Sequence, residues 1–156
     1  MIGLLQRVTG ASVAVDGAVI AAIGRGLLVL VGVEAGDGEA QADRLLERLL
    51  GYRVFPDDEG RMNRSLRELH GGLLLVPQFT LAADTGKGAR PSFSTAAQPA
   101  AGRALFEYLV HRAQAAHHEV ASGRFAAEMQ VTLTNDGPVT FWLRVPPAAG
   151  QRSEAG

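Results

Sequence analysis

A turn signal near the C-terminal end separates two stretches in which apolar residues alternate with polar ones. The alternating positions are Met129, Val131 and Leu133 before the turn, and Val139, Phe141, Leu143 and Val145 after it. Between them lie Asn135, Asp136 and Gly137, residue types that tolerate positive φ, so the pattern predicts a β-hairpin. Pro138 cannot donate to a β-ladder, which suits the first residue of a strand or an edge strand. The Gly137-Pro138 bond is also of the kind that can be cis.

Length and composition restrict the class of protein. The chain has 156 residues, of which 47% are hydrophobic and 20% charged, values typical of one globular domain. Its formal net charge of −1 provides no overall attraction to nucleic acid, and Lys87 is the sole lysine beside fourteen arginines. The chain has no cysteine, no apolar run long enough to span a membrane and no signal-peptide pattern. We therefore expect a cytoplasmic protein with no membrane association.

The remaining pattern predicts an α/β fold. We expect a single domain of mixed, barrel-like β-sheets with two main helices packed outside. Strands are predicted at 2–9, 13–15, 18–23, 27–31, 52–55 and 73–76, and helices at 39–50 and from Pro99 onward. The strands 13–15 and 18–23 are predicted to form a hairpin with a two-residue turn at Asp16-Gly17. Asp37 is a candidate N-cap and Gly51 a candidate C′ residue for the first helix, whereas 61–70 is ambiguous. Residues 82–94 read as a long loop, and 146–156 as a disordered tail.

General catalytic motifs do not occur in the chain. The four histidines fall in no metal-binding pattern, so we expect them to be solvated and expect no metal. Ser92 has no neighbouring base, and neither a nucleophile elbow nor a phosphate-binding glycine loop is present. These absences indicate a reaction that does not depend on a cofactor or on an acid–base residue of the protein.

A second stretch, Pro77-Gln78-Phe79-Thr80-Leu81, follows a buried apolar strand. A strand that ends with an amide, an aromatic ring and a hydroxyl can form a small polar pocket. Alternatively, Phe79 belongs to the core while Gln78 and Thr80 face solvent. These five residues alone do not decide between the two interpretations.

Several segments together resemble D-aminoacyl-tRNA deacylases of the bacterial and eukaryotic type. They are Leu5–Val8, Gly51–Phe55, Pro77–Thr85, Arg90–Ser94, Gly123–Ala127 and Asn135–Thr140. The resemblance covers about residues 1–145, which we therefore interpret as one deacylase-like domain. It implies a homodimer with active sites at the subunit interface and the 3′ end of aminoacyl-tRNA as ligand.

The resemblance also assigns roles to residues. Gln78, Phe79 and Thr80 would form the catalytic pocket, and a cis Gly137-Pro138 of the other subunit would reject L side chains, leaving room for D-residues and glycine. Arg7 would orient that loop, with Asn135 and Thr140 in support. The family usually has serine where this chain has Pro77. A related group with relaxed chirality also has proline there, but differs at Phe79, so we favour the chirally strict enzyme.

The implied reaction is hydrolysis of the ester in mischarged D-aminoacyl-tRNA, and of glycine mischarged on tRNA-Ala. Backbone amides around Phe79 and Thr80 could stabilise the oxyanion, and the 2′-hydroxyl of the tRNA could orient or activate water. Thr80 as a covalent nucleophile is the alternative. A relaxed-chirality deacylase, a non-catalytic RNA-binding module and a small-molecule esterase remain competing functions.

Overall fold

The computed structural model describes residues 1–147. Residues 148–156, most of the predicted tail 146–156, therefore lie outside the described part. Within 1–147 the order of elements is β1 (Ile2–Val15), β2 (Ala18–Ile23), β3 (Gly26–Gly32), α1 (Glu39–Gly51), β4 (Phe55–Pro56), β5 (Met62–Arg64), α2 (Leu66–Leu69), β6 (Gly72–Pro77), a 3₁₀ turn (Phe79–Ala82), α3 (Pro99–Ala116), β7 (Val120–Ser122) and β8 (Gln130–Arg144).

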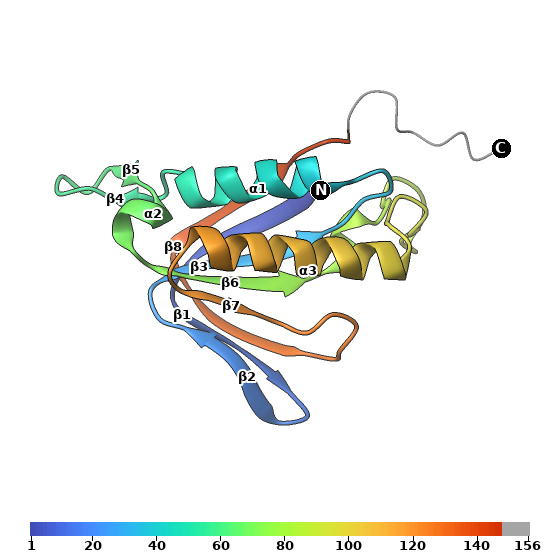
Figure 1. Ribbon diagram of the computed structural model, residues 1–156, viewed down its shortest axis with the longest axis horizontal. Coiled ribbons are helices and arrows are strands. Elements are labelled where there is room, and N and C mark those ends of the chain that lie inside the picture. Colours follow the sequence, from blue (N-terminus) through green and yellow to red (C-terminus); the bar gives the residue numbers. More distant parts are fainter. Residues whose placement is uncertain (148–156) are drawn as a thin grey trace.

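The long strand β1 organises a mixed six-stranded sheet of order β2-β1-β3-β6-β7, with β8 paired to β1 (Figure 1). On one edge, β1 pairs antiparallel with β3 and then with β2, while β8 follows its other edge. β3, β6 and β7 are parallel neighbours. Right-handed crossovers in that direction place α1 and α3 on the same face of the sheet, which is how they lie in Figure 1. The predicted α/β, barrel-like fold with two main helices is confirmed.

Apolar side chains cover both faces of the central strands, as predicted for 27–31. Leu27, Val29 and Val31 pack with α1 and α3 in one cluster. Leu28 joins a second cluster with Val8 on the opposite face, which the curling ends of β1, β2 and β8 enclose. The core thus has two layers, and the ends of β3 and β6 are held between them.

The predicted hairpin around Asn135-Asp136-Gly137 is wrong. Both halves belong to the single strand β8, and both pair with β1 rather than with each other. Gln6 pairs with Thr140 and Val8 with Asn135, so the four residues 136 to 139 face the single residue Arg7. The turn chemistry therefore forms a bulge in a strand that continues beyond it. The 14-residue β1 is long enough to pair with both halves, which removes any need for them to pair together.

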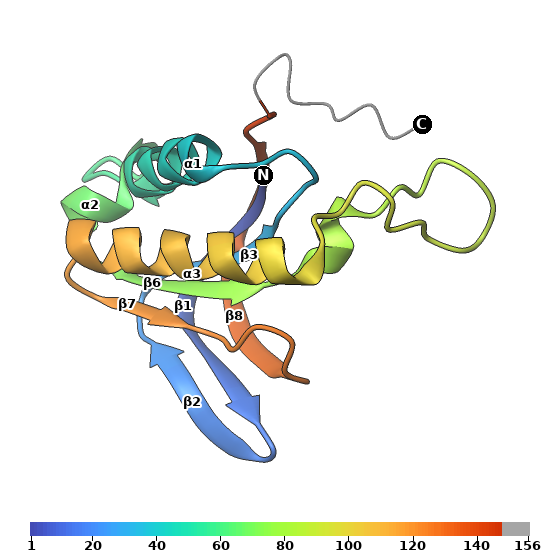
Figure 2. The ribbon, with the colours of Figure 1, turned by 45° about the vertical axis from the view of Figure 1, so that its right-hand side comes forward.

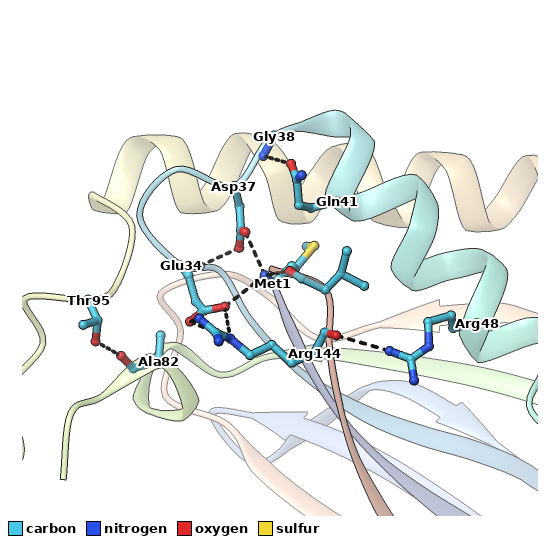
Figure 3. Close-up of polar contacts among 10 residues, drawn as sticks. Met1, Glu34, Asp37, Gly38, Gln41, Arg48, Ala82, Thr95 and Arg144 are labelled. Atoms are coloured by element: carbon cyan, nitrogen blue, oxygen red, sulfur yellow. Dashed lines mark hydrogen bonds and ion pairs between the residues drawn. The ribbon is translucent and has the colours of Figure 1, made fainter. Parts of the chain in front are cut away.

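The predicted caps of the first helix are also wrong. Gly38 is the N-cap of α1, and Gly51 is its last residue rather than C′. The Asp37 carboxylate accepts from the Met1 ammonium at 2.7 Å and from the Glu34 amide at 2.7 Å (Figure 3). A buried ammonium needs a charged partner. Asp37 therefore binds the Met1 ammonium at the start of β1 and does not cap α1.

Glu34 completes this polar cluster at the ends of β1 and β8. Its carboxylate accepts from the Met1 ammonium at 3.1 Å and from Arg144 at 2.8 Å (Figure 3). Burial raises the pKa of Glu34, but the hydrogen bonds from Arg144 and the ammonium outweigh it and hold the pKa below 4.5. For Asp37 burial is the larger effect, and the pKa is raised above 3.8 despite the bond from the ammonium.

Smaller differences concern the remaining predictions. Of the predicted strand 52–55 only Phe55 belongs to a strand, and the ambiguous 61–70 contains β5 and the short α2. His117 is buried, with its Nε2 2.6 Å from the Gly71 carbonyl, so the expectation of a solvated side chain is wrong there. The turn at Asp16-Gly17 and the helix start at Pro99 are confirmed. Within residues 1–147 no helix is long and apolar enough to cross a membrane.

Candidate functional site

Pro77 ends β6 at a place where the sheet needs no amide donor. Its neighbour β7 pairs with β6 only as far as Ser122, and the Gly123 amide then donates to Leu75 at 2.8 Å. On the other side, the Gln78 amide donates to the Val31 carbonyl at 2.8 Å. Successive amides of a strand point to opposite edges, so position 77 points toward the side where pairing has ended. The fold accommodates proline without losing a ladder bond.

The residues Phe79–Ala82 form a 3₁₀ turn, and Gln78 is its N-cap. Gln78 leaves the extended conformation, and its side-chain amide donates to the Thr80 hydroxyl. The first hydrogen bond of the turn runs from the Leu81 amide to the Gln78 carbonyl at 3.3 Å. Because the bonds of a helical turn begin there, the amides of Phe79 and Thr80 precede them. No backbone or side-chain acceptor for these two amides is found within residues 1–147.

Next to this turn is a cleft of about 610 Å³, a volume in the range of small-molecule sites. Pro77, Gln78 and Phe79 form one wall, the start of α3 forms another, and the loop after β7 forms the third. That loop contributes Phe125, Ala126, Ala127, Glu128 and Met129. Our sequence reasoning gave these residues no role, although the small and aromatic residues of Gly123–Ala127 after a short strand were a usable signal.

A second aromatic residue fixes the turn from outside. Phe93 lies 5.1 Å from Phe79 between ring centroids, and it belongs to the predicted loop. Backbone hydrogen bonds between Asp84 and Ser92 close the base of the loop, which extends from the body of the domain in Figure 2. Phe79 nevertheless remains 59% exposed, so the interpretation of Phe79 as a core residue is wrong.

The bulge of β8 is held by its own side chains. The Asn135 carboxamide accepts from the Val139 amide at 2.8 Å and donates to the Thr140 hydroxyl at 2.8 Å. Gly137 has φ of +142°, and a β-carbon there would lie 2.7 Å from the Val139 side chain. The Gly137-Pro138 bond is cis, as the resemblance implied. Both residues are exposed at the surface of the bulge.

Arg7 fastens the bulge from β1. Its guanidinium donates to the Asp136 carbonyl at 2.9 Å and to the Val54 carbonyl at 2.7 Å. The Asp136 carboxylate lies 3.5 Å away, and the Arg7 side chain is only 13% exposed. Because two backbone carbonyls depend on one fixed guanidinium, the bulge and the segment before β4 form one rigid unit.

The predicted site residues therefore form two groups within one chain. Pro77, Gln78 and Phe79 line the cleft and Thr80 adjoins it, whereas Arg7, Asn135, Gly137, Pro138 and Thr140 are gathered at the bulge. None of the bulge residues lines the cleft. Within residues 1–147, β8 pairs only with β1, so its other edge is unpaired, and Trp142 of β8 is 57% exposed. Exposed strand edges of this length are ordinarily covered.

Neither group contains a histidine. Among the described residues, no set of three His, Cys, Asp or Glu side chains is arranged to hold a metal ion. The groups that line the cleft are the Gln78 amide, the Glu128 carboxylate and aromatic or apolar side chains, with the Thr80 hydroxyl beside it. Such groups can bind and orient an ester and stabilise developing negative charge through N–H donors.

Comparisons with known proteins show the family to which the chain belongs. The family model described as D-Tyr-tRNA(Tyr) deacylase matches residues 4–144. A D-aminoacyl-tRNA deacylase of Nitrosococcus oceani is 65% identical over 148 residues, covering 95% of this chain and 96% of the relative. Those of Methylococcus capsulatus and Pseudomonas putida are 66% and 64% identical and are covered over 96% and 100% of their lengths, with 94% and 93% of this chain.

Solved structures share the fold. A c-Myc DNA unwinding element binding protein superposes with a TM-score of 0.90 at 35% identity, over 94% of this chain and 99% of that one. A probable eukaryotic D-amino acid tRNA deacylase has a TM-score of 0.79 at 20% identity, over 91% and 97% of the two chains, which supports the fold alone. From the family match and the close relatives, the chain belongs to the D-Tyr-tRNA(Tyr) deacylase family, and it is a hydrolase that deacylates D-aminoacyl-tRNA.

Proposed function

We propose that this deacylase is chirally strict, and that it removes D-amino acids and glycine mischarged on tRNA-Ala by excluding L side chains. The observation that carries this proposal is the rigid bulge. Arg7 and Asn135 fix the backbone of residues 136 to 139, and Gly137 and Pro138 are exposed at its surface. A backbone fixed in this way can act as a steric wall, because it cannot move aside to admit a side chain.

The wall acts on the cleft of a second subunit. Within one chain the bulge residues do not line the cleft. A complete site therefore combines the cleft of one chain with the bulge of another. The unpaired β8 edge and the exposed Trp142 and Phe79 are consistent with a surface that a second copy covers. An interface in which each subunit completes the other's site is isologous, so the assembly is a C2 homodimer.

Catalysis depends on positioning rather than on a protein nucleophile. The amides of Phe79 and Thr80 precede the first bond of the 3₁₀ turn and serve as donors to the oxyanion. The neighbouring 2′-hydroxyl of the terminal ribose orients or activates the attacking water at high effective concentration. Thr80 interacts with Gln78, an amide that cannot act as a base, so a nucleophilic Thr80 is not favoured. No cofactor is needed.

Pro77 leaves this mechanism unchanged. Its position needs no amide donor, and the wall against L-residues is on the bulge rather than on β6. Relative to serine it lacks one hydroxyl, worth about 0.5–1.5 kcal/mol if it bound substrate or water. Pro77→Ser should therefore change the rate about tenfold at most and leave the preference for D-substrates intact.

The experiment that tests the proposal measures release of labelled amino acid from D- and L-aminoacyl-tRNA in parallel. A strict deacylase releases the D-residue and leaves the L-ester intact. Release of both residues would support the relaxed-chirality alternative, while binding of RNA without release would support a non-catalytic module. Hydrolysis of simple esters in preference to tRNA would indicate a small-molecule esterase.

A second pair of measurements addresses the catalytic step. Thr80→Ala should retain substantial activity, whereas a substrate that ends in 2′-deoxyadenosine should react poorly. Loss of turnover in Thr80→Ala with substrate binding preserved, and normal reaction of the deoxy substrate, would instead support nucleophilic catalysis. Because the substrate is an intermediate of translation, we propose that the enzyme acts in the cytoplasm.

A further inference from the structure

A second cleft, of about 420 Å³, lies directly beside the first. One side is α3, which contributes Arg103, Glu107 and His111, and the other is the end of β7 with the loop after it, which contribute Ser122 and Arg124. Nothing in the reaction described above uses these residues. The cleft is open to solvent, which suits a ligand that passes over it rather than one enclosed by it.

The charges in this cleft favour an anion. The only carboxylate in its lining is Glu107, which lies 3.9 Å from the Arg103 guanidinium, at the limit of an ion pair. The Arg103 side chain remains 52% exposed. Arg124 is exposed and forms no ion pair with another residue of the range 1–147. His111, Gln114 and Ser122 add polar groups that can donate hydrogen bonds.

The two clefts share a wall. Phe125 lines both of them, and the neighbours Gly102 and Arg103 line the first and the second respectively. The Arg103 guanidinium lies 5.3 Å from the centre of the Phe125 ring. A polymer whose end occupies the first cleft can therefore continue past Phe125 and bring its next charged groups beside Arg103 and Arg124.

We propose that the second cleft binds the backbone phosphates of the nucleotides that precede the terminal adenosine of the tRNA. This inference rests on the proposed placement of the aminoacylated 3′ end in the first cleft. The last nucleotides of such an RNA are single-stranded and carry a phosphate at each step. Arginines in a groove that follows the strand are the usual means of binding such a backbone. Since phosphates carry no sequence information, this contact contributes affinity for any tRNA.

The test measures binding of a short single-stranded RNA ending in CCA, and of adenosine alone, over a range of salt concentrations. The variants are Arg103→Gln, Arg124→Gln and the double variant. Arg44→Gln is the matched control, because Arg44 is an exposed arginine of α1 paired with Glu47, away from both clefts. Arg103→Lys and Arg124→Lys retain the charge and should largely restore binding.

Each lost arginine should lower the slope of log affinity against log salt by about 0.7, and the double variant by about twice that. Adenosine binding and the Arg44→Gln control should be unchanged. An unchanged salt slope, or no RNA binding by the wild type, overturns the proposal. So does a parallel loss of adenosine binding, because the arginines would then act only through Phe125. Deacylation assays are run separately, so an RNA-binding result stands even if the chirality or mechanism proposed above fails.

Discussion

The bulge of β8 and the turn after β6 both carry predicted site residues, but they are held in opposite ways. Side chains fix the bulge, where Arg7 and Asn135 bond to two backbone groups, the Asp136 carbonyl and the Val139 amide, and Asn135 also bonds to the Thr140 hydroxyl. The turn is held mainly by its backbone and by the contact of Phe79 with Phe93, and Gln78, Phe79 and Thr80 stay accessible. This difference fits the proposed roles, in which the rigid bulge excludes L side chains and the accessible turn binds the substrate ester.

The largest effect should follow from Arg7→Ala. It leaves the carbonyls of Asp136 and Val54 without their charged donor in a largely buried position, so we expect a loss of about 3 kcal/mol of unfolding free energy. Released from Arg7, the bulge should also admit L-substrates. Urea unfolding and parallel D- and L-deacylation measure both effects.

Arg7→Lys is the matched control, because lysine keeps the charge but cannot bond the two carbonyls in the same fixed geometry. The unfolding free energy of Arg7→Lys and its ratio of D- to L-deacylation should both fall between those of the wild type and of Arg7→Ala. If Arg7→Ala kept the stability and the D-to-L ratio of the wild type, the bulge would not depend on side chains.

Glu34→Gln should lower stability without affecting chirality. It removes the negative charge between the Met1 ammonium and Arg144, outside both the bulge and the turn, at a cost of about 1–3 kcal/mol. The D-to-L ratio should stay that of the wild type at temperatures where the variant is folded. A changed ratio would mean that chirality follows overall stability rather than the local bonds of the bulge.

The pH dependence of this variant has a definite sign. The folded pKa of Glu34 is below 4.5, so its carboxylate stabilises the fold fully above that pH. The contribution is lost as the pH falls through the folded pKa. The stability difference between wild type and Glu34→Gln, measured by thermal unfolding, should therefore be constant down to about pH 5 and shrink in more acidic solution. A difference that grew on acidification would contradict the lowered pKa.

Asn135→Ala tests the bulge more gently than Arg7→Ala. It removes one bond from the Val139 amide and one to Thr140, so we expect about 1–2 kcal/mol of destabilisation and a measurable release of L-residues. Asn135→Asp keeps the acceptor for the Val139 amide and should retain more of the chirality. An equal D-to-L ratio in both variants would indicate that the hydrogen bond to the Val139 amide does not fix the bulge.

The smallest effect concerns the cleft wall. Ala126 has φ of +62°, in the left-handed region that costs a non-glycine residue about 1–2 kcal/mol. Glycine avoids this cost but loses more conformational entropy on folding, by about 0.5–1 kcal/mol. Ala126→Gly should thus stabilise the protein by about 0.5 kcal/mol, as measured by urea unfolding. A clear destabilisation would mean that the Ala126 side chain contributes more to packing than its backbone costs.

Local sequence patterns predicted most of the helices and strands, but not the contacts between residues that are far apart in sequence. The strands, the two main helices and the Asp16-Gly17 turn follow from periodicity and turn residues within a few positions. Asn135-Asp136-Gly137 has the same local chemistry whether it closes a hairpin or forms a bulge, and β1, more than 120 residues earlier, decides between them. Asp37 likewise has the pattern of a helix cap, yet the Met1 ammonium, 36 residues away in sequence, binds it.

The candidate site shows the same division. The resemblance predicted site residues in the turn and in the bulge, because their motifs are contiguous in sequence. The cleft wall formed by Phe125 to Met129 was missed because it becomes a wall only when β7 lies beside β6 and α3 covers it. Pro77 looked like a departure from the pattern until the end of β7 showed that no donor is needed there.

Mixed dimers test most directly whether the bulge of one subunit guards the cleft of the other. One variant, Asn135→Ala, has a loosened bulge. The other, Phe79→Glu, places a carboxylate where the oxyanion would form and should be inactive. Mixing Asn135→Ala subunits with an excess of Phe79→Glu subunits should pair every working cleft with an intact bulge. If the site is shared, release of L-residues falls toward the wild-type level while D-deacylation persists. An unchanged D-to-L ratio would contradict the account, because each cleft would then be guarded by the bulge of its own chain.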